Sequence, residues 1–143
     1  MKFLLIILAA GCQISFGQDR DALAWAGCYE LQAEGQHSII SNYGIVPRRL
    51  QLTVERESIR GWFLAKREGS SGREASWLWY INRDGSVEVS PRGSWITDGW
   101  FIELSRSGPA VRGTARYLTD TGGGARTFRI VGHKVACSLQ RAK

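Results

Sequence analysis

The sequence predicts an all-β fold, a single antiparallel up-and-down barrel of about eight strands, with a β-sandwich as the alternative. From Trp25 onward, apolar and polar residues alternate in short runs that turn-forming residues separate, and helical periodicity is nearly absent. Two cysteines, Cys28 and Cys137, stand near the two ends of this region. With 143 residues, of which 43% are hydrophobic, the chain has the length of one domain and is too apolar for a disordered protein.

The first residues predict an export signal. Lys2 precedes an uncharged apolar run over residues 3–10. This run is shorter than the ~20 residues that span a bilayer and matches the apolar region of a secretory signal. The small residues Ser15 and Gly17 occupy positions −3 and −1 of a cleavage site before Gln18. We therefore expect residues 1–17 to be a signal peptide and residues 18–143 to be a β-barrel domain that is periplasmic or extracellular.

Lipidation is a second interpretation of the same segment. Ala9-Ala10-Gly11-Cys12 resembles the lipobox of bacterial lipoproteins, although the leucine usual at its first position is absent. A lipidated Cys12 would tether the protein to the cell envelope, whereas cleavage before Gln18 would release it. No later stretch is long and apolar enough to cross a membrane, so membrane attachment is expected only through Cys12.

The remaining cysteines predict a disulfide. Both processing routes remove Cys12 from thiol chemistry, which leaves Cys28 and Cys137. Disulfides persist in exported proteins, so we expect a Cys28–Cys137 bond, with two separate buried thiols as the alternative. Bridged Cα atoms lie ~5.5 Å apart, which requires neighbouring first and last strands. These cysteines are far apart in sequence and His37 and His133 are isolated, so we expect no metal and no other cofactor.

Alternation assigns one face of each predicted strand to the interior, because residues two apart share a face. Asn82-Arg83-Asp84-Gly85 predicts a hairpin turn, since Asp-Gly supplies the positive φ that such turns need. Ser107-Gly108-Pro109 predicts another turn. The expected inward residues, strand by strand, are Trp25, Gly27, Tyr29 and Leu31; Leu50, Leu52 and Val54; Ile59, Gly61 and Phe63; Ala75, Trp77, Trp79 and Ile81; Val87 and Val89; Trp100, Ile102 and Leu104; Val111, Gly113, Ala115 and Tyr117; and Phe128 and Ile130.

Two short motifs resemble those of lipocalins and their calycin relatives. Gly27-Cys28-Tyr29 is similar to the Gly-x-Trp of the first lipocalin strand, with tyrosine in place of tryptophan. Thr119-Asp120 is similar to the start of the lipocalin Thr-Asp-Tyr motif, which Thr121 does not complete. The resemblance covers the mature chain in layout. It implies a barrel in which the first-strand aromatic residue packs across the closed end, near an arginine of the last strand, here Arg126 or Arg129.

Catalytic motifs are absent from the sequence. There is no Gly-x-Ser-x-Gly elbow, no P-loop and no His-Glu-x-x-His. Gly122-Gly123-Gly124 precedes a strand-like segment, whereas a phosphate cradle needs a helix start behind it, so we interpret the glycines as a hairpin turn. We therefore expect a protein that is not an enzyme.

The predicted inner face is rich in aromatic and small residues, which leaves two interpretations. A small eight-stranded barrel is either filled by side chains or holds one small ligand. Inward Gly61, Gly113 and Ala115 would leave room, which favours an exported, lipocalin-like binding module for a small apolar ligand. The expected ligand-binding residues are Trp77, Trp79, Trp100, Gly113, Ala115, Tyr117 and Phe128.

Charge suggests a function from another class. The net charge is +6, and 18 − 13 = +5 after loss of the signal. Arg112 and Arg116 share the outer face, and Trp62 and Trp95 lie outside the predicted core. Arginine with exposed tryptophan binds anionic polymers by ion pairing and stacking. An exported protein rarely meets nucleic acid, so the alternative is an envelope structural or interaction protein with a solid core, which binds an envelope polyanion through surface Arg and Trp.

Overall fold

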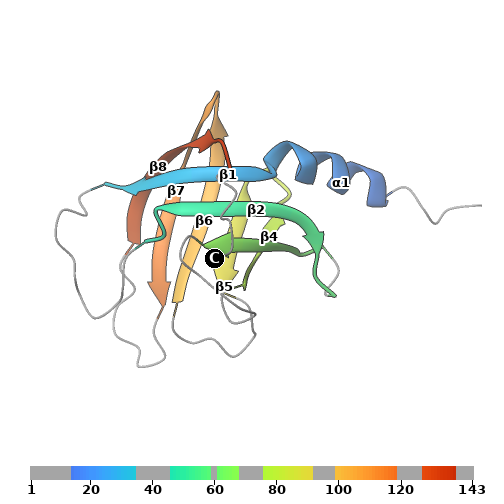
Figure 1. Ribbon diagram of the computed structural model, residues 1–143, viewed down its shortest axis with the longest axis horizontal. Helices are drawn as coiled ribbons and strands as arrows, with labels where there is room; N and C mark the ends of the chain where they lie inside the picture. The colour runs from blue at the N-terminus through green and yellow to red at the C-terminus, as the bar shows by residue number, and fades with distance from the viewer. Residues whose placement is uncertain are drawn as a thin grey trace, which may run out of the picture.

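The described residues form one helix and an eight-stranded closed barrel (Figure 1). The computed structural model describes residues 14–34, 46–58, 61–67, 76–91, 99–118 and 127–137. The elements are α1 (Ile14–Trp25), β1 (Gly27–Ala33), β2 (Arg49–Arg56), β3 (Phe63–Arg67), β4 (Ser76–Ile81), β5 (Val87–Pro91), β6 (Gly99–Ser107), β7 (Ala110–Leu118) and β8 (Thr127–Val135). Each strand is antiparallel to the next. The predicted up-and-down barrel is confirmed, and the β-sandwich alternative is wrong.

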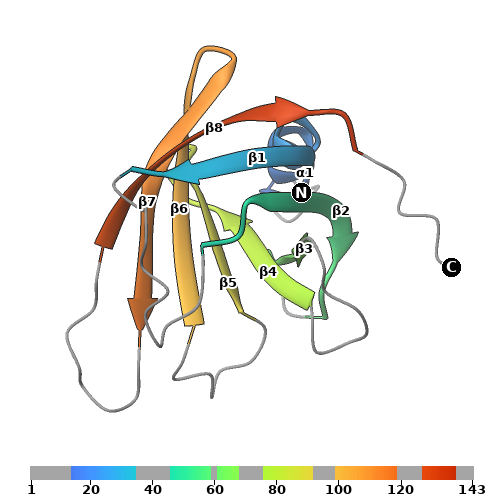
Figure 2. The ribbon, with the colours of Figure 1, turned by 60° about the vertical axis from the view of Figure 1, so that its left-hand side comes forward.

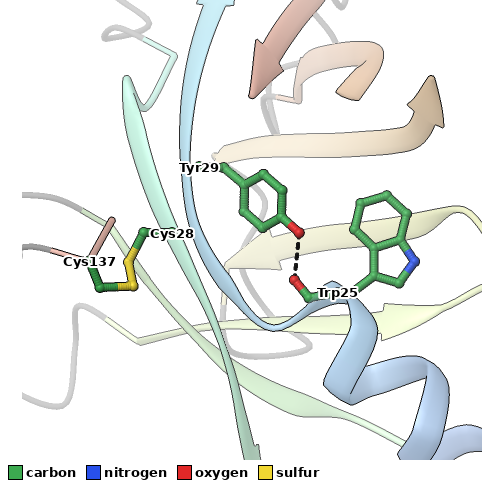
Figure 3. The surroundings of a disulfide bond; sticks show 4 residues. All are labelled: Trp25, Cys28, Tyr29 and Cys137. Carbon is green, nitrogen blue, oxygen red and sulfur yellow. Dashed lines mark hydrogen bonds between the residues drawn. A yellow bond between two sulfur atoms is a disulfide. The ribbon is translucent and has the colours of Figure 1, made fainter. Parts of the chain in front are cut away.

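The barrel closes where β8 lies beside β1 (Figure 2). Their antiparallel register begins with Cys28 opposite Val135. Cys28 and Cys137 form the expected disulfide, with Cα atoms 5.2 Å apart (Figure 3). The bond therefore joins the start of β1 to the residues just after β8, and it lies on the seam that closes the barrel.

Alternate strand residues point inward and form one hydrophobic core. Closure of the barrel leaves no edge strand unpaired. It also gives every strand one face that packs inside and one that meets solvent. The largest fully buried side chains come from six of the strands and match the alternation in the sequence: Leu50, Leu52, Phe63, Trp79, Val87, Val89, Ile102, Leu104 and Ile130.

The structure corrects the prediction that Trp25 begins the first strand. Trp25 is the last residue of α1, and β1 begins two residues later at Gly27, which has a φ of 141°. A side chain is strained at that φ, and a Cβ atom at Gly27 would also overlap the side chain of Lys134. The helix begins at Ile14, so the cleavage expected before Gln18 falls within it. That cleavage stays a prediction, and it would leave residues 18–25 attached to β1.

The third strand also differs from the prediction. Strand β3 begins at Phe63, where the predicted strand ended, and Gly61 lies in a turn with φ of 84°. The register of β2 against β3 shifts between Leu52 and Arg56, so the pairing of the two strands is irregular there. Val54, expected inside, lies within this irregular stretch and is 48% exposed. Among the described residues, no helix has the length and hydropathy needed to span a membrane.

Candidate functional site

The two ends of the barrel differ in how they are built. At one end lie α1 and the short turns between β4 and β5 and between β6 and β7; we call this the plugged end. The opposite end contains the last residues of β1, β3, β5 and β7 and the first residues of β2, β4, β6 and β8. Figure 2 shows the β6–β7 hairpin at the top and the opposite ends of these two strands at the bottom.

Helix α1 is fastened to the barrel through Trp25, which is 3% exposed. The Tyr29 hydroxyl donates a hydrogen bond to the Trp25 carbonyl over 2.6 Å, as Figure 3 shows. The Trp25 indole N–H donates to the carbonyl of Gly85 over 3.2 Å. The Arg106 guanidinium lies 4.5 Å from the centre of the Trp25 ring, which is a cation–π distance. These contacts join the helix to β1, to the β4–β5 turn and to β6.

The cations beside these aromatic residues differ from the arginines that the lipocalin resemblance implied. Lys134 of β8 lies 5.9 Å from the Tyr29 ring, and Arg106 of β6 lies over Trp25. The carbonyl of Arg129 instead accepts a hydrogen bond from the Glu34 N–H, 2.9 Å away, at the opposite end of the barrel. The expectation for Arg129 is therefore wrong. Arg126, the other candidate, and the Thr119-Asp120 motif lie outside the described residues.

The opposite end brings together three predicted ligand-binding residues. Trp100 of β6 pairs with Tyr117 of β7, and their rings meet edge-on with centroids 5.1 Å apart. The ring of Phe128, from β8, lies 5.6 Å from that of Trp100. Trp77, the second residue of β4, lies at this same end and is 8% exposed. We call this end, defined by Trp77, Trp100, Tyr117 and Phe128, the aromatic end.

Alanines lie beside these rings on the inner face. Ala65 is opposite Trp77, and Ala115 is opposite Phe128; both alanines are 0% exposed. Ala115 was predicted as a site residue, whereas Ala65 was missed. Ala65 has the same parity as Phe63, which was predicted to point inward, so extending the predicted strand by two residues would have indicated it.

Two predicted site residues are placed away from the aromatic end. Trp79 is 0% exposed in the middle of the core, where its indole N–H donates to the carbonyl of Thr53 over 2.9 Å. Gly113 does not provide the expected room. A Cβ atom there would overlap the Glu103 carbonyl oxygen and lie 3.0 Å from the Leu104 Cα. Gly113 is therefore needed for the close approach of β6 and β7, and a large side chain there would disrupt the sheet rather than fill a pocket.

One buried side-chain polar atom in the described part of the chain lacks a hydrogen-bond partner. Among the described residues, the indole Nε1 of Trp100 is buried without a hydrogen-bond partner. Buried donors are paired in the great majority of cases, so an unpaired one in a cluster of rings is a distinctive feature. The sequence could not reveal it, because the pairing of an indole N–H depends on neighbours from other strands.

A separate cleft of about 330 Å³ lies at the plugged end. It was not predicted, and its lining is Asp21, Ala24, Trp25, Ile81, Asp84, Gly85, Ser86, Ser105 and Arg106. Hydrogen bonds from the Ser86 side chain and backbone lower the pKa of Asp84. They also order the β4–β5 turn, in which Gly85 has a φ of 83°, as the Asp-Gly pair predicted.

The outer face of β7 and β8 carries arginines. Arg112 and Arg116 are exposed on the same side of β7, as predicted, and Arg129 lies opposite Thr114, between them. Glu103 of β6 lies on the other side of Thr114. The local sum is three positive charges and one negative charge, which makes this face a candidate site for an anion.

The expected exposure of Trp62 is only partly right. Its half-buried ring lies 4.3 Å from that of Tyr80 on the outside of the barrel. The Tyr80 hydroxyl donates to Glu88 over 2.7 Å. Burial, this hydrogen bond and the negative charges of Glu88 and Glu103 raise the pKa of Tyr80 to about 12. Trp62 is thus part of a packed outer cluster, and Trp95 lies outside the described residues.

The fold and the site together define an eight-stranded antiparallel barrel with a helix at one end and an aromatic cluster inside the other. This architecture is compatible with a lipocalin-like fold. No family model, no curated protein and no solved structure matches the chain. Within the described ranges, no three His, Cys, Asp or Glu side chains gather in a way that would hold a metal ion.

Proposed function

We propose that this protein is a non-enzymatic binding module that holds one small apolar ligand at the aromatic end of its barrel. The observation that carries the proposal is the inward cluster of Trp100, Tyr117 and Phe128. Tyr117 and Phe128 are only partly buried, and they pack against the core at the end opposite helix α1. A ligand that covers their remaining apolar surface would gain ~25 cal/mol per Å².

Small neighbours support the same proposal. Ala65 and Ala115 are the cross-strand neighbours of Trp77 and Phe128, and their short side chains take up little of the barrel interior. Eight-stranded barrels of this kind have interiors that hold at most one small ligand. The disulfide on the seam supports export, because such bonds persist in oxidising compartments. Lipidation of Cys12, which lies outside the described residues, would add an envelope anchor to this module.

Phe128→Ala tests the binding site. Loss of the ring removes apolar contact with a ligand, so we expect affinity for ethylnaphthalene to fall about tenfold. Displacement of the dye N-phenylnaphthylamine measures this affinity. Leu23→Ala is the control, because Leu23 is 66% exposed on the helix at the other end. Equal affinities of both variants and the unaltered protein would refute a site at the aromatic end.

A second candidate function is binding of an envelope polyanion, which the exposed arginines on the outer face of β7 and β8 favour. We expect the double variant Arg112→Gln/Arg116→Gln to bind labelled heparin oligosaccharide at least tenfold more weakly at low salt. Binding by the unaltered protein should also weaken steeply between 0.05 and 0.3 M salt, over which the Debye length shortens from roughly 14 to 6 Å.

The control for this experiment is Arg83→Gln, which removes an exposed arginine from the β4–β5 turn. It lowers the net charge without touching the β7–β8 face. If Arg83→Gln weakens heparin binding as much per charge as the double variant does, the attraction is general and the face is not a site. Dye binding at the aromatic end should be insensitive to salt in every variant, which separates the two functions.

A further inference from the structure

The unpaired indole N–H of Trp100 carries information about the ligand. Trp100 is 5% exposed, and its Nε1 is the buried side-chain nitrogen that lacks a partner among the described residues. Two other buried tryptophans satisfy theirs. Trp79 donates to Thr53 over 2.9 Å, and Trp25 donates to Gly85 over 3.2 Å. The barrel thus provides hydrogen-bond acceptors for the indole groups in its middle and at its plugged end. At the aromatic end, the Trp100 N–H has no acceptor among the described residues.

An indole N–H can only donate, so an acceptor oxygen or nitrogen is the group that would satisfy it. Leaving such a donor buried and unpaired destabilises the folded protein, and a ligand that pairs it gains the corresponding free energy. The nearest described rings, Tyr117 and Phe128, lie edge-on and tilted to the Trp100 ring. Backbone groups of β6 and β7 are engaged in the ladder that pairs Trp100 with Tyr117. An acceptor supplied by the ligand therefore complements the site.

The acceptor is expected to be uncharged. The buried polar or charged residues in the described part of the chain are Ser86 and Ser90, so no lysine, arginine or histidine there is buried. A carboxylate or phosphate at this depth would lose its hydration without gaining a countercharge, which is strongly unfavourable. A ketone, aldehyde, ester or ether oxygen accepts one hydrogen bond at a much smaller desolvation cost.

We propose that the ligand is a neutral, largely apolar molecule with one hydrogen-bond acceptor, and that Trp100 Nε1–H selects it by donating to that acceptor. This inference rests on the proposed binding function and adds the chemical class of the ligand and the residue that discriminates it. Tyr117 and Phe128 would contact the apolar part of the ligand.

The test uses two probes of nearly equal shape, acetylnaphthalene and ethylnaphthalene, which differ in a carbonyl. We expect the ketone to displace N-phenylnaphthylamine at about tenfold lower concentration than the hydrocarbon. In Trp100→Phe the two probes should bind equally, because the ring remains and the donor is gone. Trp62→Phe, which alters an indole on the outer face, is the matched control and should keep the tenfold preference.

The outcomes separate this inference from the function on which it rests. If both probes bind the unaltered protein equally and Trp100→Phe changes nothing, the donor plays no part and the inference is overturned, while the binding function stands. If neither probe displaces the dye, both the inference and the proposed binding function are refuted. Should Trp100→Phe fail to fold, the benzothiophene analogue of tryptophan at this position removes the N–H and keeps the shape. The indole proton signal of Trp100 gives an independent readout, since acetylnaphthalene should move it downfield and ethylnaphthalene should not.

Discussion

Removing the disulfide with Cys28→Ser/Cys137→Ser should lower the free energy of unfolding by about 4 kcal/mol. The bond closes a loop with a sequence separation of 109 residues, which spans nearly the whole barrel. In the unfolded chain such a cross-link removes much of the conformational freedom, and the chain-entropy model gives ~4.7 kcal/mol for a 100-residue loop. The bond also lies at the seam, where β1 and β8 depend on contacts between the two ends of the chain.

Denaturant unfolding of the oxidised protein and of the double variant measures this difference. Adding a reducing agent to the unaltered protein should reproduce the loss, and adding it to the double variant should change nothing. A loss below about 1 kcal/mol would mean that the strand ladder alone closes the barrel and that the unfolded chain keeps its ends together without the bond.

Gly113→Ala should lower the free energy of unfolding by about 3 kcal/mol, although it adds a single methyl group. That methyl group would overlap the Glu103 carbonyl oxygen and lie 2.8 Å from its carbon. Backbone atoms of β6 cannot rotate away as a side chain would, so the two strands must separate or bend. Pairs from Glu103–Thr114 to Ser105–Arg112 surround this point in the ladder.

Thr114→Ala is the matched control for this variant, because it changes the next residue of β7, whose side chain is exposed. We expect Thr114→Ala to lower the free energy of unfolding by less than about 1 kcal/mol. Thermal unfolding with circular dichroism compares the two. If Gly113→Ala is as stable as Thr114→Ala, the close approach of β6 and β7 at this position is wrong, and an inward pocket at residue 113 would again be a reasonable interpretation.

Alternation and the two cysteines were sufficient to predict the strands and their closure. Leu50 and Leu52, like Ile102 and Leu104, are inside as their spacing indicated. The failures were local. Trp25 has the same parity as Tyr29, so the alternation placed it in the first strand. Its helix is only weakly amphipathic and offers no apolar stripe to detect.

The candidate site was predictable in composition and only partly in arrangement. Trp100, Tyr117 and Phe128 share an inward parity, and antiparallel pairing then brings them to one end. Contacts across strands could not be inferred, because they depend on register. Val54 is exposed where the register of β2 against β3 shifts, and the steric role of Gly113 follows from the position of Glu103 on the neighbouring strand.

Native mass spectrometry of the protein, produced with its own N-terminus in a bacterial host and gently extracted, tests the central proposal most directly. We predict the mass of a chain that begins at Gln18, reduced by two hydrogen atoms because Cys28 and Cys137 form a disulfide. It should carry a small-molecule mass that collisional activation removes and that Phe128→Ala retains poorly. A bare protein mass that stays bare after acetylnaphthalene is added would contradict a ligand site inside the barrel.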